Sequence, residues 1–135
     1  MDYKVIDIEG VGPVYAEKLQ AVGVEKASQL LEMCAKPAGR KALAEKTGIN
    51  DALILKWANH CDLYRIKGVG PQFAELLEAA GVDTVKEFSH RVAANLEKKM
   101  IEVNEQKHLT RRTPSQKELQ KMIDQAKEMA PVMTY

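Results

Sequence analysis

Apolar residues recur at helical spacing along most of the chain. From Val14 they fall every three or four positions and stop before Gly23, and the same stripe returns between Phe73 and Gly81. This spacing places apolar side chains on one face of a helix, and glycine commonly ends such a helix. No alternating run of apolar and polar residues exceeds about four positions, so strand signals are weak. The pattern predicts an all-α protein.

Six further segments carry the same helical signals: residues 26–34, 38–48, 50–61, 84–92, 95–109 and 116–129. Three of them begin with residues that are suited to cap a helix, and Asn50 or Asp51 caps the segment 50–61. Asp83 or Thr84 caps another, with Glu87 placed to close a capping box, and Ser115 with Glu118 forms the same arrangement before a third. The sequence therefore predicts capped helix starts at these three places.

A stretch near the N-terminus is repeated in the second half of the chain. "IEGVGPVYAEKL" and "IKGVGPQFAELL" open residues 8–31 and 66–89, which share nearly half of their amino acids. An internal repeat of this length indicates a repeated structural unit. We therefore expect two modules, residues 1–61 and 62–135, joined without a flexible linker.

Each copy contains a Gly-Val-Gly-Pro turn directly before its helix. Glycine carries no steric penalty at positive φ, so the two glycines allow a sharp turn around one apolar residue. Proline suits the first turn of the following helix, where its missing N–H leaves no gap. Such a turn would leave exposed backbone amides at a helix N-terminus, and these attract anions such as phosphate.

The repeated pattern I-x-G-V-G-P-x-x-A-x-x-L-x-x-x-G resembles the helix-hairpin-helix motif of DNA repair, recombination and topoisomerase proteins. Over the whole chain, including "LAEKTGI", "CDLYRIKGVG", "GVDTVKEF" and "RRTPSQKELQKMI", the sequence also resembles an uncharacterised bacterial family of tandem helix-hairpin-helix proteins, a domain of unknown function. The resemblance implies two tandem helix-hairpin-helix modules packed as a pseudo-repeat. It also implies that hairpin amides hold DNA phosphates without reading base sequence.

Carried over position by position, the motif implies six phosphate-facing residues: Gly10, Val11 and Gly12 in the first turn, and Gly68, Val69 and Gly70 in the second. The charges beside the two turns differ. Glu9 beside the first turn would repel phosphate, whereas Arg65 and Lys67 beside the second would attract it. We therefore expect the second turn to be the better phosphate site.

Arg111 and Arg112 form a basic pair in an expected loop. Two guanidinium groups there could clamp one phosphate or a carboxylate. The other small basic clusters are expected to be solvated helix faces: Arg40 with Lys41, and Lys98 with Lys99.

The charge balance limits the strength of any nucleic-acid binding. Net charge is +1; residues 1–61 carry 8 basic and 8 acidic side chains, and residues 62–135 carry 12 and 11. Proteins that neutralise many phosphates usually have a basic excess. Two functions therefore stay open. One is a sequence-independent module that binds nucleic acid, either double-stranded DNA, weakly and non-specifically, or RNA; the other is a module that binds a protein partner or serves as a scaffold.

The sequence contains no catalytic constellation, so we expect a non-enzymatic protein without a cofactor. The surroundings of His60, His90 and His108 in the sequence contain no arrangement of Ser, Cys or carboxylate that would suggest a relay. Cys34 and Cys61 are expected to be buried thiols; a metal site shared with His60 or His90 is the alternative, but the chain has neither CxxC nor HxxxH spacing. The turns also lack the third glycine of a dinucleotide site and the GK[ST] of a phosphate-binding nucleotide loop.

The chain shows no apolar run of about 18 residues and does not open with a signal peptide, so we expect a cytoplasmic protein without a membrane segment. Trp57 lies on an apolar stripe and is expected in the core, as are Tyr15 and Phe73, which are equivalent in the repeat. Glu17 and Glu75 also recur, and we expect them to face the positive end of the helix dipole.

Overall fold

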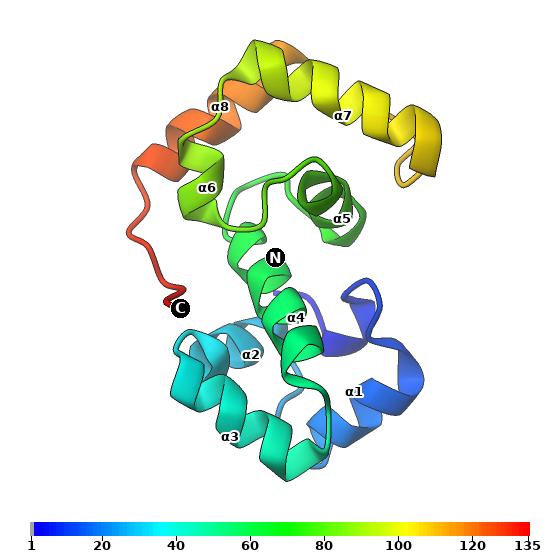
Figure 1. Cartoon of the computed structure of the whole chain (residues 1–135), viewed down its shortest axis with the longest axis vertical. Helices are drawn as coiled ribbons and strands as arrows, with labels where there is room; N and C mark the ends of the chain where they lie inside the picture. The colour runs from blue at the N-terminus through cyan, green and yellow to red at the C-terminus, as the bar shows by residue number, and fades with distance from the viewer. Residues whose placement is uncertain (1) are drawn as a thin grey trace. The chain divides into compact units, whose positions relative to one another are not determined.

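The computed structural model describes residues 2–135, which form eight α-helices and one short 3-10 helix (Figure 1). Within these residues there is no β-strand, only an isolated bridge between Lys4 and Lys26. The predicted all-α fold is confirmed for this part of the chain. None of the helices formed by residues 2–135 has the length and apolar character needed to cross a membrane.

The elements follow in this order: η1 (Val5–Asp7), α1 (Gly12–Gln20), α2 (Ala27–Cys34), α3 (Pro37–Thr47), α4 (Asp51–Leu63), α5 (Pro71–Ala79), α6 (Val85–Ser89), α7 (Ala93–Lys107) and α8 (Gln116–Lys127). Each segment predicted as helical overlaps one of these helices. The ends differ from the predicted ones by a few residues because helix ends depend on local capping contacts.

The helices divide between two compact units. The first runs from the N-terminus to Asp62 and also includes Val132–Tyr135, and the second is Leu63–Pro131. The chain passes from the first unit to the second within α4 and returns after α8. Val132–Tyr135 therefore belong to the first unit, whereas the module boundaries expected from the sequence include them in the second module, residues 62–135.

The helices α1, α2 and α3 of the first unit each bury one side, whereas every residue of α4 from Trp57 onward is buried. Trp57 is fully buried, as predicted, and the half-buried Tyr15 ring meets it edge-on, with ring centroids 5.2 Å apart. Aromatic pairs favour this edge-to-face arrangement. The other large, fully buried side chains of these helices are Leu19, Leu30, Leu43 and Ile54.

Gly39 lies where α2 and α3 pack together. Its backbone is helical, but a Cβ at this position would overlap the carbonyl oxygen of Met33 in α2. Glycine at this position therefore allows the two backbones to approach closely.

Arg40 joins the C-terminal segment to the first unit. Its guanidinium donates to the carbonyl oxygens of Cys34 at 2.9 Å, Ala35 at 3.2 Å and Thr134 at 2.8 Å, and it lies over the Tyr135 ring. The Thr134 N–H donates in turn to the Ala35 carbonyl at 2.8 Å. Arg40 is only 8% exposed, so the expectation of a solvated Arg40 is wrong. The cation satisfies carbonyls that the end of α2 leaves unpaired.

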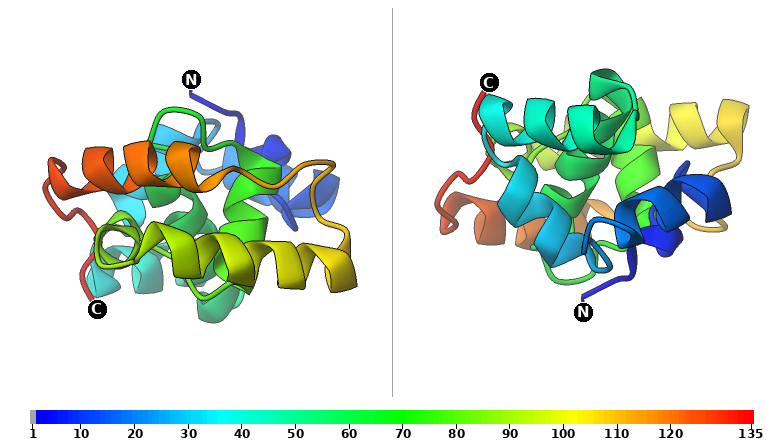
Figure 2. Two further views of the ribbon diagram at one scale, coloured as in Figure 1. Left: turned by 90° about the horizontal axis from the view of Figure 1, so that it is seen from above. Right: turned by 90° about the horizontal axis from the view of Figure 1, so that it is seen from below.

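The second unit contains α5, α6, α7 and α8. The last two helices lie side by side, and α6 packs against α8 (Figure 2). Phe73 is half-buried, so its predicted place in the core is only partly realised. The core of this unit includes the buried side chains of Leu77, Phe88, Met100, Leu119 and Ile123.

The predicted caps of α6 and α8 form to different extents. At α8 the Ser115 hydroxyl accepts the Glu118 N–H at 3.1 Å and the Glu118 carboxylate accepts the Ser115 N–H at 3.3 Å, so the capping box is confirmed. At α6 the Thr84 hydroxyl accepts the Glu87 N–H at 3.2 Å. The Glu87 carboxylate instead accepts from Arg91 at 3.0 Å, so only half of the predicted box forms.

Candidate phosphate-binding turns

Both repeated turns close with the same hydrogen bond. The Val11 N–H donates to the Ile8 carbonyl at 3.1 Å, and the Val69 N–H donates to the Ile66 carbonyl at 3.1 Å. Both valines are buried. Since the valine amides complete the turns, the amides that remain for an anion belong to the neighbouring glycines and to the helix starts.

Positive backbone angles explain the glycines that the sequence repeats. Gly10 and Gly68 have φ of +89° and +94°, which side chains rarely adopt. Gly23 and Gly81, at +86° and +96°, follow the ends of α1 and α5. The predicted sharp turns and helix stops are confirmed at these four positions.

The second glycines of the two turns, Gly12 and Gly70, differ from each other in backbone conformation. Gly12 has φ of +66° and is already the first residue of α1. Gly70 is extended, with φ −112° and ψ −173°, and stands before α5 as its N-cap. This is the usual N-cap geometry, and it puts Pro71 at the first helical position, which suits proline.

The start of α5 carries amides that no side chain caps. The first hydrogen bond of this helix runs from the Ala74 N–H to the Gly70 carbonyl at 2.8 Å, and Pro71 has no N–H. Within residues 2–135, nothing accepts from the N–H groups of Gly70, Gln72 and Phe73. These three amides point toward the N-terminal side of the helix, where its dipole is positive.

Helix α8 lies against the second turn. The Lys67 N–H donates to the Gln125 side-chain oxygen at 2.9 Å, and a Cβ on Gly68 would lie 3.1 Å from the methyl group of Met122. Between the turn and α8 there is a cavity of about 480 Å³. It is lined by Lys67, Gly68, Glu118, Lys121, Met122 and Gln125.

Arg65 has a structural contact of its own. Its guanidinium donates to the carbonyl oxygen of Ala130 at 2.8 Å and so holds the segment that follows α8. The side chain is half-buried rather than extended into solvent beside the turn. Lys67, by contrast, is exposed. Of these two cations, which are close in the sequence, only Lys67 is therefore exposed beside the turn.

Arg112 clamps a carboxylate of the protein itself. Two nitrogens of its guanidinium donate to the two Glu118 oxygens at 2.8 and 3.0 Å, a bidentate pair. The Arg112 hydrogen bond lowers the pKa of Glu118 to about 2, and the same bond raises the pKa of Arg112. Arg111 is exposed. Arg112 alone therefore binds this internal carboxylate, and Arg111 is not part of the bidentate pair.

The first turn has a more apolar surface. Ile6 is 43% exposed and Val14 is 67% exposed, whereas the repeat places a polar Gln72 at the position of Val14. Glu9 is half-buried. A Cβ on Gly10 would lie 3.8 Å from Nε1 of Trp57. This turn therefore offers less to an anion than the second.

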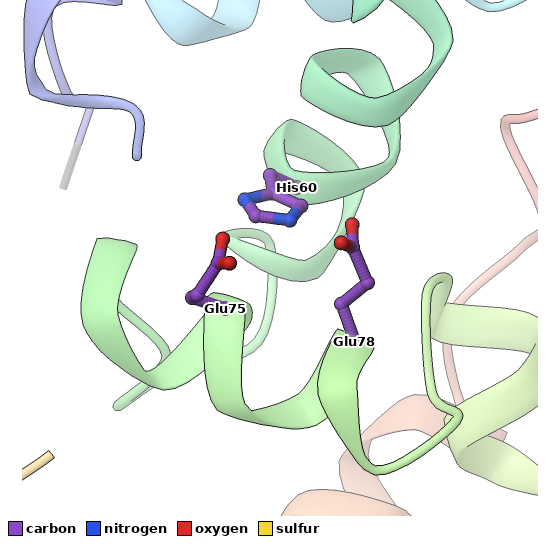
Figure 3. Close-up of side chains that lie close together, drawn as sticks. All are labelled: His60, Glu75 and Glu78. Atoms are coloured by element: carbon purple, nitrogen blue, oxygen red, sulfur yellow. The ribbon is translucent and has the colours of Figure 1, made fainter. Parts of the chain in front are cut away.

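The repeated acids do not stand at helix starts. Neither α1 nor α5 has an acidic residue in its first turn, so the expectation that Glu17 and Glu75 face the helix dipole is wrong. Glu75 and Glu78 project from the same side of α5, one turn apart (Figure 3).

The two cysteines are both unpaired and buried, as predicted. Burial raises the pKa of the Cys34 thiol to about 11 and raises that of Cys61 further above its ordinary value. Thiols protonated in this way are poor nucleophiles and poor metal ligands at neutral pH. These residues behave as small core side chains.

Sequence reasoning missed the contribution of α8 to the second turn. Lys121, Met122 and Gln125 lie in one stripe along α8, and all three line the cavity beside Lys67. Their i, i+1 and i+4 spacing is ordinary for a helix that packs on a neighbour. Nothing local marks them as partners of a turn more than 50 residues earlier.

A comparison with protein-family models places the chain in a family. Residues 9–129 match the model described as a domain of unknown function, DUF4332. The chain belongs to this family. The DUF4332 match contains both repeated turns and all eight α-helices, and it ends before Val132–Tyr135. No curated protein and no solved structure matches the chain.

Proposed function

We propose that this DUF4332 protein is a non-enzymatic module that binds nucleic acid without reading base sequence. In this proposal the two units are tandem helix-hairpin-helix modules that form a pseudo-repeat. Matching closing bonds at Val11 and Val69 and matching positive φ angles at Gly10 and Gly68 support it. Because the two Cys thiols are buried and unpaired, we place this activity in the reducing cytoplasm.

The uncapped start of α5 carries this proposal. A backbone phosphate there would accept from the amides of Gly70, Gln72 and Phe73, which have no acceptor within residues 2–135. Within residues 2–135, α1, α3 and α7 also start without a side-chain cap, whereas α6 and α8 have caps from Thr84 and Ser115. The preceding glycine turn, and not the missing cap alone, distinguishes the start of α5. Oriented amides and the positive helix end are well suited to phosphate.

The charges around the second turn supply moderate attraction. Lys67 is exposed beside it, and Arg111 is exposed in the loop before α8. Arg65 is bound to the Ala130 carbonyl and keeps its net charge, so it adds long-range potential, whereas the charge of Arg112 is offset by Glu118. We expect only two to four phosphates to be neutralised, which gives a slope of log affinity against log salt of roughly −2 to −4.

A salt titration of fluorescent DNA binding tests the proposal. Lys67→Glu should weaken binding because it places a carboxylate beside the phosphate site. Lys98→Glu is the matched control, since Lys98 is an exposed lysine on α7 and the change in charge is the same. Equal losses of DNA affinity in both variants would indicate diffuse electrostatic attraction instead of a defined phosphate site. Absence of binding at low salt by the folded protein would end the nucleic-acid proposal.

A second function is favoured by the apolar surface of the first turn. Val14 and Ile6 are more exposed than most large apolar residues here, and exposed apolar groups favour protein contacts. On this alternative the first turn binds a protein partner. Val14→Glu should then abolish that association, measured by sedimentation with the partner or with a second copy, while DNA binding stays unchanged.

A further inference from the structure

The cavity beside the second turn has two walls of different origin. One wall is the turn itself, at Lys67 and Gly68, and the other is a stripe of α8. The hydrogen bond from Lys67 N–H to Gln125 fixes the two walls against each other. The cavity volume of about 480 Å³ lies within the range of roughly 300–1,000 Å³ that is usual for small-ligand sites.

The lining combines apolar surface with two exposed cations. The half-buried Met122 side chain and the Cα of Gly68, which carries no side chain, contribute to the apolar surface. Lys67 and Lys121 are exposed, and within residues 2–135 neither is in an ion pair. The one carboxylate of the lining, Glu118, is already neutralised by Arg112. An apolar group that carries an anion fits this lining.

The cavity adjoins the proposed phosphate site. Gly68 lines the cavity, and Gly70 offers the first uncapped amide of α5. Two residues of extended chain span at most about 7 Å, so the cavity and the amides are within the reach of one nucleotide. A base in a duplex is stacked and paired and cannot enter such a site, whereas an unpaired base can.

We propose that this cavity receives an unpaired nucleobase, so that the nucleic acid bound at the second turn is single-stranded. This inference rests on the proposed function, because the phosphate on α5 brings the base to the cavity. The Met122 side chain contacts the face of the base, and Lys121 contacts the adjoining phosphate. Methionine suits this role because its flexible, polarisable chain adapts to different bases.

Three fluorescent probes of equal length test the inference at low salt: an oligo-dT strand, the same strand made of abasic sites, and a duplex. We expect oligo-dT to bind at least about tenfold more tightly than the other two, which carry phosphates but offer no unpaired base. Met122→Ala should remove most of that preference and leave duplex binding unchanged. Met33→Ala, a change of an exposed methionine on α2, is the control and should have no effect.

The outcomes separate the two proposals. Equal affinity for oligo-dT and the abasic strand, or tighter duplex binding, overturns the inference and leaves the phosphate site in place. Loss of oligo-dT preference in Met33→Ala as well as in Met122→Ala also overturns it. No binding of any probe by the folded protein overturns the proposed function and the inference together. Circular dichroism of each variant checks that it is folded.

Discussion

The Cα of Gly39 in α3 packs so closely on the Met33 carbonyl of α2 that no side-chain carbon fits between them. Alanine normally stabilises a helix interior by about 1 kcal/mol relative to glycine. At this position we expect the opposite sign. Gly39→Ala should destabilise the protein by about 2–3 kcal/mol, because the two helices must move apart.

Urea unfolding of Gly39→Ala measures this effect. Ala38→Gly is the control, since Ala38 is the exposed neighbour on the same helix. It should cost about 1 kcal/mol through propensity alone. A Gly39→Ala protein that is more stable than wild type would contradict the close packing of α2 and α3.

Arg40 should matter for stability far more than its neighbour Lys41. Arg40→Ala leaves the carbonyls of Cys34, Ala35 and Thr134 without their shared donor, and we expect a loss of about 2–3 kcal/mol. Lys41→Ala, at an exposed position, should change stability by less than about 0.5 kcal/mol. Thermal or urea unfolding compares the two variants. Equal effects would show that Arg40 does not hold the C-terminal segment.

The second turn should tolerate alanine less well than the first. Gly68→Ala forces a side chain to φ of +94° and towards the Met122 methyl, whereas Gly12→Ala sits at +66° with nothing within 4 Å. We expect the free energy of unfolding to fall by about 2 kcal/mol in Gly68→Ala and by about 1 kcal/mol in Gly12→Ala. Urea midpoints of the two variants test this order. The reverse order would mean that α8 does not restrict the second turn.

The Glu118 carboxylate should titrate far below its ordinary range. Its pKa of about 2 in the folded protein is depressed from 4.5, so the pair stabilises the fold above pH 4.5 and loses that effect as pH falls from 4.5 towards 2. Arg112→Gln should raise the titration midpoint, as seen in the side-chain NMR shift, because the largest cause of the depressed pKa is removed while the Ser115 hydrogen bonds remain. Lys117→Gln should leave the midpoint unchanged. A midpoint near 4.5 in wild type would contradict the bidentate pair.

Local patterns in the sequence predict most of the helices but not how they meet. The Ser115 cap and the stops at Gly23 and Gly81 depend on neighbours a few residues away, so they are readable from the chain. Arg40 is different, because its acceptor on Thr134 lies 94 positions later. Charge and spacing alone make it look like a surface residue.

The candidate site also has some features that the sequence predicts and others that it does not. The glycines and the proline of the second turn follow from backbone preferences, which the sequence exposes directly. The contacts of Lys67 with Gln125 and of Gly68 with Met122 depend on where α8 packs. Arg112 also looked available to a ligand, yet its partner Glu118 is the acid of a capping box that was itself predicted.

The return of Val132–Tyr135 to the first unit makes that unit discontinuous in the chain, with the second unit inserted into it. On the ribosome, every residue of the inserted unit is made before Thr134 reaches Arg40. The first unit therefore gains the hydrogen bonds of Thr134 with Arg40 and Ala35 only after the whole second unit has been synthesised.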